Sequence, residues 1–164
     1  MSGALDPEPL LRALDEAAVS HIVVGGFAVN AHGYLRTSAD LDVVPDPEPE
    51  NLVRLARLLR ELAADQVEST DFGADELPAD PTDPADLARG GNFRLATRLG
   101  ALDVMQWLSG IDAPDLYAEL ATEAVDGRLA GIPVRVCGLR HLRAMKAASA
   151  RPRDLDDLAH LPEA

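Results

Sequence analysis

The sequence predicts a single α/β domain. Its 164 residues are an ordinary length for one domain with a real hydrophobic core, and segments with helical and strand periodicity follow one another along it. No apolar run approaches the roughly 20 residues that a membrane span requires, and the N-terminus lacks a basic, apolar leader. We therefore expect a soluble, cytoplasmic protein without a membrane partner.

The N-terminal part of the chain is expected to alternate helix and strand. A helix should begin at Asp6-Pro7-Glu8-Pro9, because Asp6 can cap it and both prolines fall in its first turn. The same tetrapeptide at 46–49 predicts a second helix. Between them we predict a strand over 21–24, a short helix over 26–32 and a strand over 40–44. The apolar faces of the two long helices are assigned to Leu10, Leu11, Leu14, Ala17 and Ala18 and to Leu52, Leu55, Leu59, Leu62 and Ala63.

The second half begins with a segment of unusual composition. Residues 73–92 are rich in proline, glycine and acid and contain little to bury, so we expect an acidic loop or flap. Segments 93–98 and 101–107 flank Leu99-Gly100 and predict a hairpin with Asp103 in its second strand. A helix near 114–121, a hairpin from 122–129 and 132–137, and two closing helices over 139–149 and 153–161 complete the prediction.

Charge limits the partners that we expect. The net charge of −13 argues against broad electrostatic binding to nucleic acid. Lys146 is the only lysine among 15 basic residues, an exception that chance and a chemical role explain about equally well. The single cysteine, Cys137, cannot form an internal disulfide and is expected to be a small buried hydrophobe. A large RNA acceptor would require one local basic patch formed by Arg140, Arg143, Lys146, Arg151 and Arg153.

Two aspartates separated by one residue form the first candidate site. In a strand over 40–44, Asp40 and Asp42 point to one face while Leu41 and Val43 enter the core. Two like charges side by side are costly without a cation, and Mg²⁺ prefers carboxylates together with phosphate oxygens and retained water. The pair therefore predicts a site for a metal-bound nucleotide, with a solvated strand end as the alternative.

Two further features can contribute to the same chemistry. Backbone amides at the Gly25-Gly26 turn can approach phosphate oxygens, because no Cβ intervenes, although a simple tight turn explains the glycines equally well. Asp103 lies in the middle of a predicted strand. A charge there rarely stays buried without a partner, so Asp103 either lies on a solvated face or joins a polar site.

In this order, the motifs resemble the polymerase β-like nucleotidyltransferase superfamily, and most closely its small bacterial AbiEii-type branch. The branch has a strand, a Gly-Gly or Gly-Ser turn, a helix and then Gly-x-x-Arg-x-Thr-x-Asp-x-Asp, which this chain matches over 33–42 with Ser38 in place of the usual threonine. Its closing pattern, a lysine followed by Arg-x-x-Asp-x-x-Asp-Leu, is similar to Lys146 and residues 151–158.

The resemblance implies a polymerase β-like fold, with a mixed twisted sheet backed by helices and closed by C-terminal helices. It also implies site residues. Asp40, Asp42 and Asp103 would hold Mg²⁺ or Mn²⁺, with Asp103 alternatively acting as base toward the acceptor hydroxyl. The nucleotide would be bound by Gly25, Gly26, Arg36, Ser38 and Lys146, and Lys146 would also be catalytic.

Several roles remain open at this stage. Arg36 can pair with phosphate, orient the aspartates or form a surface salt bridge. Lys146 can reach the triphosphate as a point charge, or its stem can extend along a helix face to water. Ion pairs that support the site, with one of the aspartates orienting Lys146, are expected from Arg151, Arg153, Asp154 and Asp157.

The implied function is transfer of a nucleoside monophosphate from a nucleoside triphosphate such as ATP to a hydroxyl of an RNA, protein or small-molecule acceptor. Members of this branch often act as toxins of toxin–antitoxin pairs, and some modify the ends of transfer RNA. Transfer RNA and an antitoxin protein are therefore the implied partners. The alternatives are a catalytically inactive nucleotide-binding or partner-binding regulatory module on the same fold, and a purely structural interaction domain.

Overall fold

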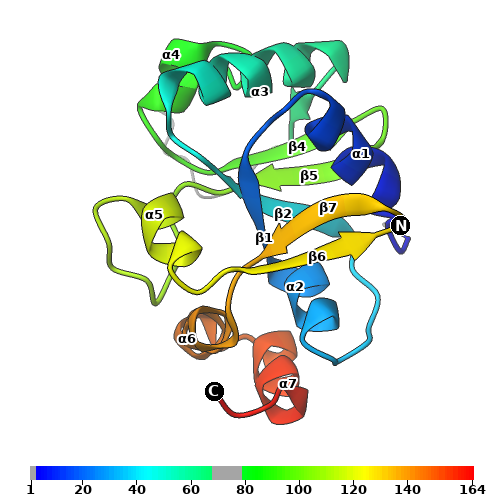
Figure 1. The fold of residues 1–164 in the computed structure, drawn as a ribbon, viewed down its shortest axis with the longest axis vertical. Helices are drawn as coiled ribbons and strands as arrows, with labels where there is room; N and C mark the ends of the chain where they lie inside the picture. The colour runs from blue at the N-terminus through cyan, green and yellow to red at the C-terminus, as the bar shows by residue number, and fades with distance from the viewer. Residues whose placement is uncertain (1–2, 68–78) are drawn as a thin grey trace.

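The strands of the protein form one mixed sheet, seen in a computed structural model that describes residues 3–67 and 79–164 (Figure 1). The sheet has seven strands in the order β3-β4-β5-β2-β1-β7-β6. They are β1 His21–Val24, β2 Asp40–Pro45, β3 Asp65–Gln66, β4 Phe93–Thr97, β5 Gly100–Val104, β6 Val125–Leu129 and β7 Ile132–Val136.

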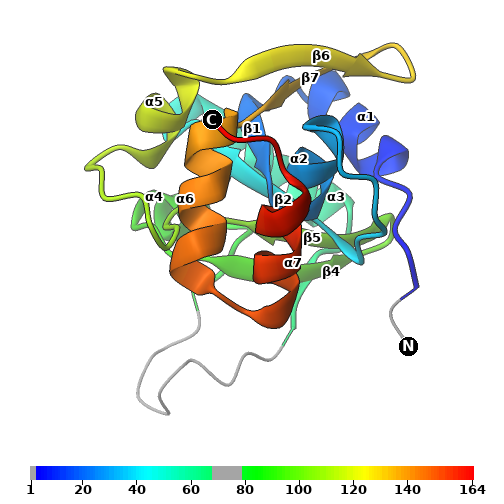
Figure 2. The same ribbon diagram turned by 90° about the horizontal axis from the view of Figure 1, so that it is seen from below.

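Helices cover both faces of this sheet. They are α1 Glu8–Glu16, α2 Gly25–Ala31, α3 Pro49–Glu61, α4 Pro84–Ala88, α5 Leu116–Ala121, α6 Leu139–Ser149 and α7 Pro152–His160. Helices α1, α3 and α4 lie on one side, and α2, α6 and α7 lie on the other (Figures 1 and 2). No helix within the described ranges is both long and apolar enough to cross a lipid bilayer.

The pairing of the central strands brings distant parts of the chain together. Strand β1 pairs antiparallel with β2 and parallel with β7, whereas β2 pairs parallel with β5. Both predicted hairpins are present, β4 with β5 and β6 with β7. The mixed sheet with helices on both faces confirms the predicted fold class. Cys137 is fully buried, as expected.

The two long N-terminal helices are shorter than predicted. Ala18 and Ala63 were assigned to apolar faces, but both are exposed and lie just beyond the helix ends with φ of 56° and 51°. A residue in the left-handed region after the last turn ends a helix, because its amide turns back toward the carbonyls of that turn. The apolar faces therefore end one residue earlier than the sequence pattern indicates, at Ala17 and at Leu62.

The acidic segment is also more structured than predicted. Of the loop predicted over 73–92, residues 73–78 lie outside the described ranges, and Pro84–Ala88 form helix α4. Asp83 caps this helix by accepting the amide of Ala85, and Leu87 is fully buried. The burial of one leucine thus stabilises a helix in a segment whose composition indicated a loop. The short strand β3 was not predicted at all.

Candidate functional site

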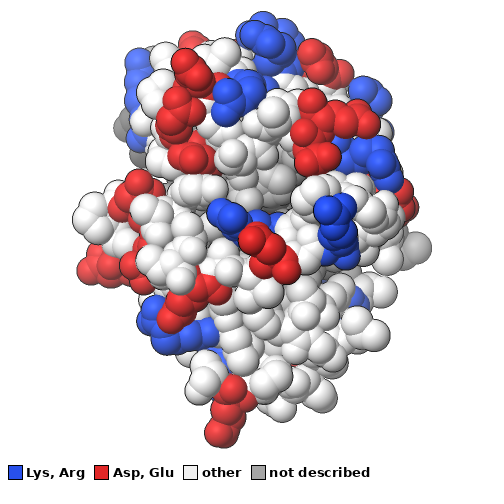
Figure 3. Space-filling model, viewed as in Figure 1, with Lys and Arg blue, Asp and Glu red and all other residues white. Residues whose placement is uncertain are grey.

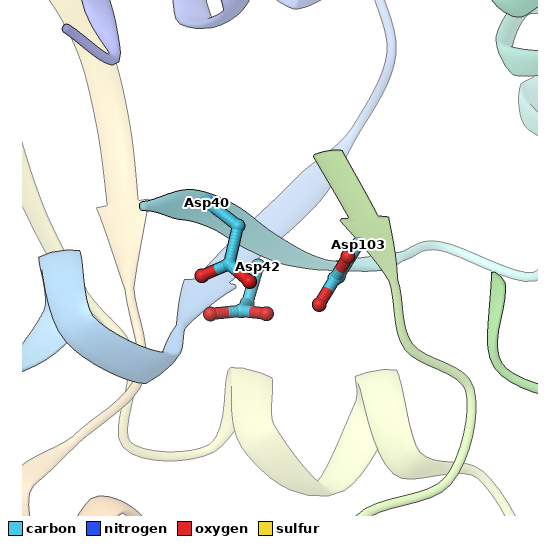
Figure 4. A group of neighbouring side chains, drawn as sticks. All are labelled: Asp40, Asp42 and Asp103. Carbon is cyan, nitrogen blue, oxygen red and sulfur yellow. The ribbon is translucent and has the colours of Figure 1, made fainter. Parts of the chain in front are cut away.

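Three carboxylates meet where β2 and β5 run side by side. The parallel register places Asp42 opposite Asp103, and Asp40 shares a face of β2 with Asp42 because it lies two residues earlier. One ligand oxygen from each of the three side chains lies within 4.8 Å of the others. Figure 4 shows the three side chains turned toward the same space. The pairing of two strands thus gathers residues that are far apart in the sequence.

Burial and mutual repulsion change the acidity of this cluster. Burial is the main reason that the pKa of Asp42 is raised well above its ordinary value, followed by the charges of Asp40 and Asp103. Burial and then the charge of Asp40 raise the pKa of Asp103 to about 6. Oδ1 of Asp103 is buried and has no hydrogen-bond partner within the described part of the chain. A buried carboxylate oxygen without a donor, beside two like charges, fits a ligand atom for a hard cation.

The glycine turn at the start of α2 lies directly against this cluster. Gly25 has φ of +70°, and a Cβ atom at this position would lie 2.1 Å from Oδ2 of Asp42. The close approach explains why this position is glycine, since any side chain would displace the carboxylate. The turn and the carboxylates are therefore one unit of structure.

We predict that Gly25→Ala destabilises the protein by about 2–3 kcal/mol, because it combines a strained positive φ with a steric clash against Asp42. The free energy of unfolding from urea denaturation measures this change. Gly33→Ala is the matched control, since Gly33 also has a positive φ of +108° but no atom within 4 Å of the added Cβ. An equal loss in both variants would mean that backbone strain alone, without the contact to Asp42, sets the cost.

The next glycine, Gly26, also packs tightly against the loop before β2. A Cβ atom on Gly26 would lie 2.7 Å from Oγ of Ser38 and 3.0 Å from a terminal nitrogen of Arg36. Ser38 is buried, and its hydroxyl donates to the main-chain carbonyl of Asp40 at 3.0 Å. The hydroxyl thus fixes the start of the strand that carries the aspartates, and a threonine hydroxyl at this position could make the same bond.

Lys146 is enclosed by two carboxylates of α7. Its Nζ lies 3.1 Å from Oδ1 of Asp154 and 3.0 Å from Oδ2 of Asp157, and the residue is 8% exposed. The interpretation of Lys146 as a stem that extends to water is therefore wrong. Arg36 binds the same Asp157 through two hydrogen bonds of 2.6 and 2.8 Å, so its ion pair is buried rather than superficial.

This network lowers the pKa values of Asp154 and Asp157. Burial alone would raise the pKa of Asp154, but hydrogen bonds from Arg151 and Lys146 outweigh it and the pKa is lowered. Burial is likewise outweighed at Asp157 by hydrogen bonds from Arg36 and Lys146, and its pKa is lowered too. The carboxylates therefore stay charged, and they fix where Lys146 and Arg36 lie.

One cleft of about 590 Å³ is lined by every residue that the sequence predicted for the site. It also includes residues that the sequence did not indicate, namely Asn92, Arg94, Met105, Trp107, Leu108, Leu142 and Met145.

The basic patch considered for an RNA acceptor does not form. Of its five members, Lys146, Arg151 and Arg153 line the cleft. Arg140 instead pairs with Glu119 and Glu123, and Arg143 donates to carbonyls near the C-terminal end. The five cations thus do not gather in one patch.

A single asparagine shapes the apolar side of the cleft. Oδ1 of Asn92 accepts the amides of Gln106 and Trp107, and its Nδ2 donates to the carbonyl of Trp107. These bonds end β5 at Val104, earlier than the predicted residue 107, because they take the amides that a longer strand would use. Trp107 is left 64% exposed at the cleft. The only signal in the sequence was that it is the only tryptophan.

Known structures share this fold. The chain is similar to the crystal structure of ANT(2'')-Ia in complex with adenylyl-2''-tobramycin, with a TM-score of 0.55 and 19% sequence identity over 93% of this chain and 83% of that chain. It is also similar to the crystal structure of a candidate nucleotidyltransferase from Thermotoga maritima, with a TM-score of 0.58 and 14% identity over 94% and 92% of the two chains. No protein-family model and no curated protein matches the chain. The likeness establishes that the protein has an α/β nucleotidyltransferase fold.

Proposed function

We propose that the protein is a metal-dependent nucleotidyltransferase, which moves a nucleoside monophosphate from a nucleoside triphosphate to a hydroxyl group and releases pyrophosphate. The observation that carries this proposal is the gathering of Asp40, Asp42 and Asp103 against the Gly25 turn inside one cleft. The likeness of the fold to nucleotidyltransferase structures supports it.

The carboxylate cluster would hold Mg²⁺ or Mn²⁺. Three carboxylates, one with a buried oxygen that lacks a donor, are hard oxygen ligands of the kind these cations prefer. When bound, the cation would neutralise negative charge on the transferring phosphoryl group and on the leaving pyrophosphate.

The remaining roles belong to side chains and backbone of the cleft. Amides of Gly25 and Gly26 would bind phosphate oxygens, and Arg36 and Ser38 would hold this turn in place. Asp103 would complete a second metal position or accept the proton of the acceptor hydroxyl, for which a pKa of about 6 is suitable. In the transfer, the acceptor oxygen forms the new bond to phosphorus while the bond from phosphorus to pyrophosphate breaks.

Lys146 would place its positive charge beside the triphosphate, oriented by Asp154 and Asp157. The same enclosure favours a second candidate function. An ammonium group already paired with two carboxylates has less capacity to neutralise phosphate, as expected for a regulatory module that binds a nucleotide without turnover. Nucleotide binding in the absence of transfer would identify that module.

The sequence motifs support more specific proposals for the donor, the acceptor and the biological role. The AbiEii-type pattern supports ATP or another nucleoside triphosphate as donor and a toxin that an antitoxin protein controls. Transfer RNA is one acceptor that this branch suggests. The charge of −13 and the positions of Arg140 and Arg143 away from the cleft favour a smaller acceptor, as does the adenylylated tobramycin bound to ANT(2'')-Ia.

Incubation with each radiolabelled triphosphate, Mg²⁺ or Mn²⁺ and total cell extract tests the proposed transferase. We expect label in one of the RNA, protein or small-molecule fractions, and only when a divalent cation is present. Label that moves equally well in excess chelator would contradict a metal-dependent reaction. Nucleotide that binds but leaves every fraction unlabelled would select the regulatory module.

Trp107 provides a direct measure of binding. Because it is the only tryptophan and lines the cleft, a triphosphate that binds there is expected to change the fluorescence intensity, since the ligand would replace water around the exposed indole ring. Titration with ATP and Mg²⁺ measures this change. Asp42→Asn is expected to weaken the response, whereas unchanged titration curves in that variant would show that the ligand binds elsewhere.

Metal binding should stabilise the protein in a manner that depends on pH. Since the folded pKa values of Asp42 and Asp103 are raised, their ionisation reduces the stability of the metal-free protein as pH rises. For Asp103 this loss falls between its unfolded pKa of about 4 and its folded pKa of about 6. A divalent cation requires the ionised forms. At about ten times its Kd, Mg²⁺ should add about 1.4 kcal/mol, or about 3–6 °C in Tm, near pH 8, and almost nothing near pH 5. Thermal melts at both pH values, with K⁺ at matched ionic strength as control, measure this difference.

A further inference from the structure

Strand β6 is an exposed edge of the sheet. It is the last strand in the order, it pairs only with β7 within the described ranges, and all five of its residues are exposed. Figure 2 places it at the outer border of the molecule. The opposite edge is β3, which has only two residues. An exposed edge strand of five residues presents unpaired amides and carbonyls that a further strand can bind.

The hairpin turn determines which backbone groups point outward. Ala130 and Gly131 both have positive φ, 49° and 80°, as in a two-residue type I′ turn. Such a turn makes Leu129 and Ile132 a hydrogen-bonded pair, and hydrogen-bonded and non-bonded pairs then alternate along the ladder. Arg128 accordingly stands opposite Pro133, which has no N–H to donate. The backbone groups of Asp126 and Arg128 are therefore directed away from β7.

The sequence of β6 is complementary to itself in the antiparallel direction. If two copies pair about a twofold axis through Gly127, Asp126 of each copy lies opposite Arg128 of the other. In the same register Val125 lies opposite Leu129, and these side chains are 52% and 42% exposed in the single chain. Opposite charges and apolar side chains that face each other across two strands stabilise the pairing, whereas like charges destabilise it.

We propose that β6 is a self-association surface, on which a second copy of this chain pairs antiparallel about Gly127 to extend the sheet across a twofold axis. In this register, the outward-directed backbone groups of Asp126 in each copy bond to those of Arg128 in the other copy. It also continues the apolar face of the sheet, because Val125 and Leu129 share that face with the buried Ile132 and the half-buried Val134. Both copies contribute the same surface to the interface, as twofold symmetry requires.

The surroundings of β6 allow this contact. On the face seen in Figure 3, acidic and basic side chains are interspersed, so the net charge of −13 is not gathered into one acidic patch on that face. Two strands, β1 and β7, separate β6 from the strand that carries Asp40 and Asp42. The association therefore leaves the cleft open, and it does not depend on the proposed function of the cleft.

Five residues from each copy form a small interface. Because stable complexes bury about 1,200–2,000 Å², we expect a weak dimer with a Kd on the order of 10–100 µM. Sedimentation equilibrium of the wild-type chain from about 5 to 500 µM covers that range. A monomer at every concentration would overturn the proposal.

Charge reversal tests the register. Asp126→Arg places two arginines opposite each other in each half of the interface, and Arg128→Asp does the same with two aspartates, so each variant should dimerise about tenfold or more weakly. An equimolar mixture of the two variants restores every Asp–Arg pair and should form a heterodimer. The double variant restores the same pairs between identical copies and should form a homodimer. Dimers that both single changes leave intact, or a mixture that remains monomeric, would contradict this register.

Two controls separate association from folding. Asp126 also pairs with Arg135 of its own chain at 2.9 Å, but both side chains are largely exposed, so the hairpin tolerates the loss. Far-UV circular dichroism and Tm at low concentration should therefore match the wild type. Arg128→Pro removes an outward N–H opposite Pro133 without removing a backbone hydrogen bond between β6 and β7, and it should also yield a monomer. It does remove the exposed side-chain bond from Arg128 to the carbonyl of Gly131, so Tm is measured for this variant too. A dimer that survives this change would contradict edge pairing.

Discussion

Asp42→Asn is expected to lower the rate of nucleotide transfer by about 10³-fold, because it removes a charged metal ligand from the centre of the cluster and several kcal/mol of transition-state stabilisation with it. The amide has nearly the same shape, so the fold should be retained. Transfer of radiolabel from the triphosphate in Mg²⁺ measures the rate. Asp40→Asn should behave in the same way, since its carboxylate belongs to the same cluster.

The same substitution should raise the stability of the metal-free protein. Burial and two neighbouring charges raise the pKa of Asp42, so its ionised form is unfavourable in the folded state. Asparagine removes that charge, and we expect a Tm increase of a few degrees near neutral pH, or about 1 kcal/mol. Asp65→Asn, at an exposed position on β3, is the control and should change neither quantity. A Tm that falls in Asp42→Asn would indicate that the carboxylate is a structural group rather than a ligand awaiting a cation.

Asp157→Ala is expected to destabilise the protein by about 3–5 kcal/mol, because it leaves Arg36 and Lys146 as buried cations without their shared partner. Asp157 is fully buried and accepts two hydrogen bonds from Arg36 in addition to the contact with Lys146. Urea denaturation at pH 7 measures the loss. The neighbouring Asp156 is exposed and bonds only to Tyr34 and His160 among described side chains, so Asp156→Ala should cost less than about 1 kcal/mol.

The contribution of Asp157 should also depend on pH in a defined direction. Its folded pKa is lowered, so its stabilisation is present above the unfolded pKa near 4 and is lost as pH falls through the folded value. The difference between the wild type and Asp157→Ala should therefore narrow below about pH 4. A difference that stays constant down to about pH 2 would mean that lost packing, and not the ion pairs, causes the destabilisation.

The elements that the sequence predicted well are those bounded by local signals. Strand β1 begins and ends at the predicted residues, and the turn at Ala130-Gly131 separates β6 from β7 as expected. Proline at the start of a helix and glycine in a turn act through the local backbone, so a single sequence is sufficient to place them. Helix α4 was missed because its burial depends on one residue, Leu87, which packs under α3 rather than repeating along a face.

The candidate site was predictable in its parts and not in its assembly. Asp40 and Asp42 share a face because a strand has a period of two residues, which any single sequence reveals. The position of Asp103 opposite Asp42 depends on parallel pairing between strands far apart in the chain. The enclosure of Lys146 depends in turn on how α7 packs against α6, and no local pattern determines that angle.

The parallel pairing of β2 with β5 has a consequence for how the chain reaches its native state. Contacts between segments distant in sequence form late, because the entropy of closing the intervening loop must first be overcome. The antiparallel pair of β1 and β2 can form with only two negative charges side by side, and the third is added when β5 docks. The electrostatic repulsion within the cluster therefore reaches its full strength only after β5 has docked, late in the assembly of the sheet.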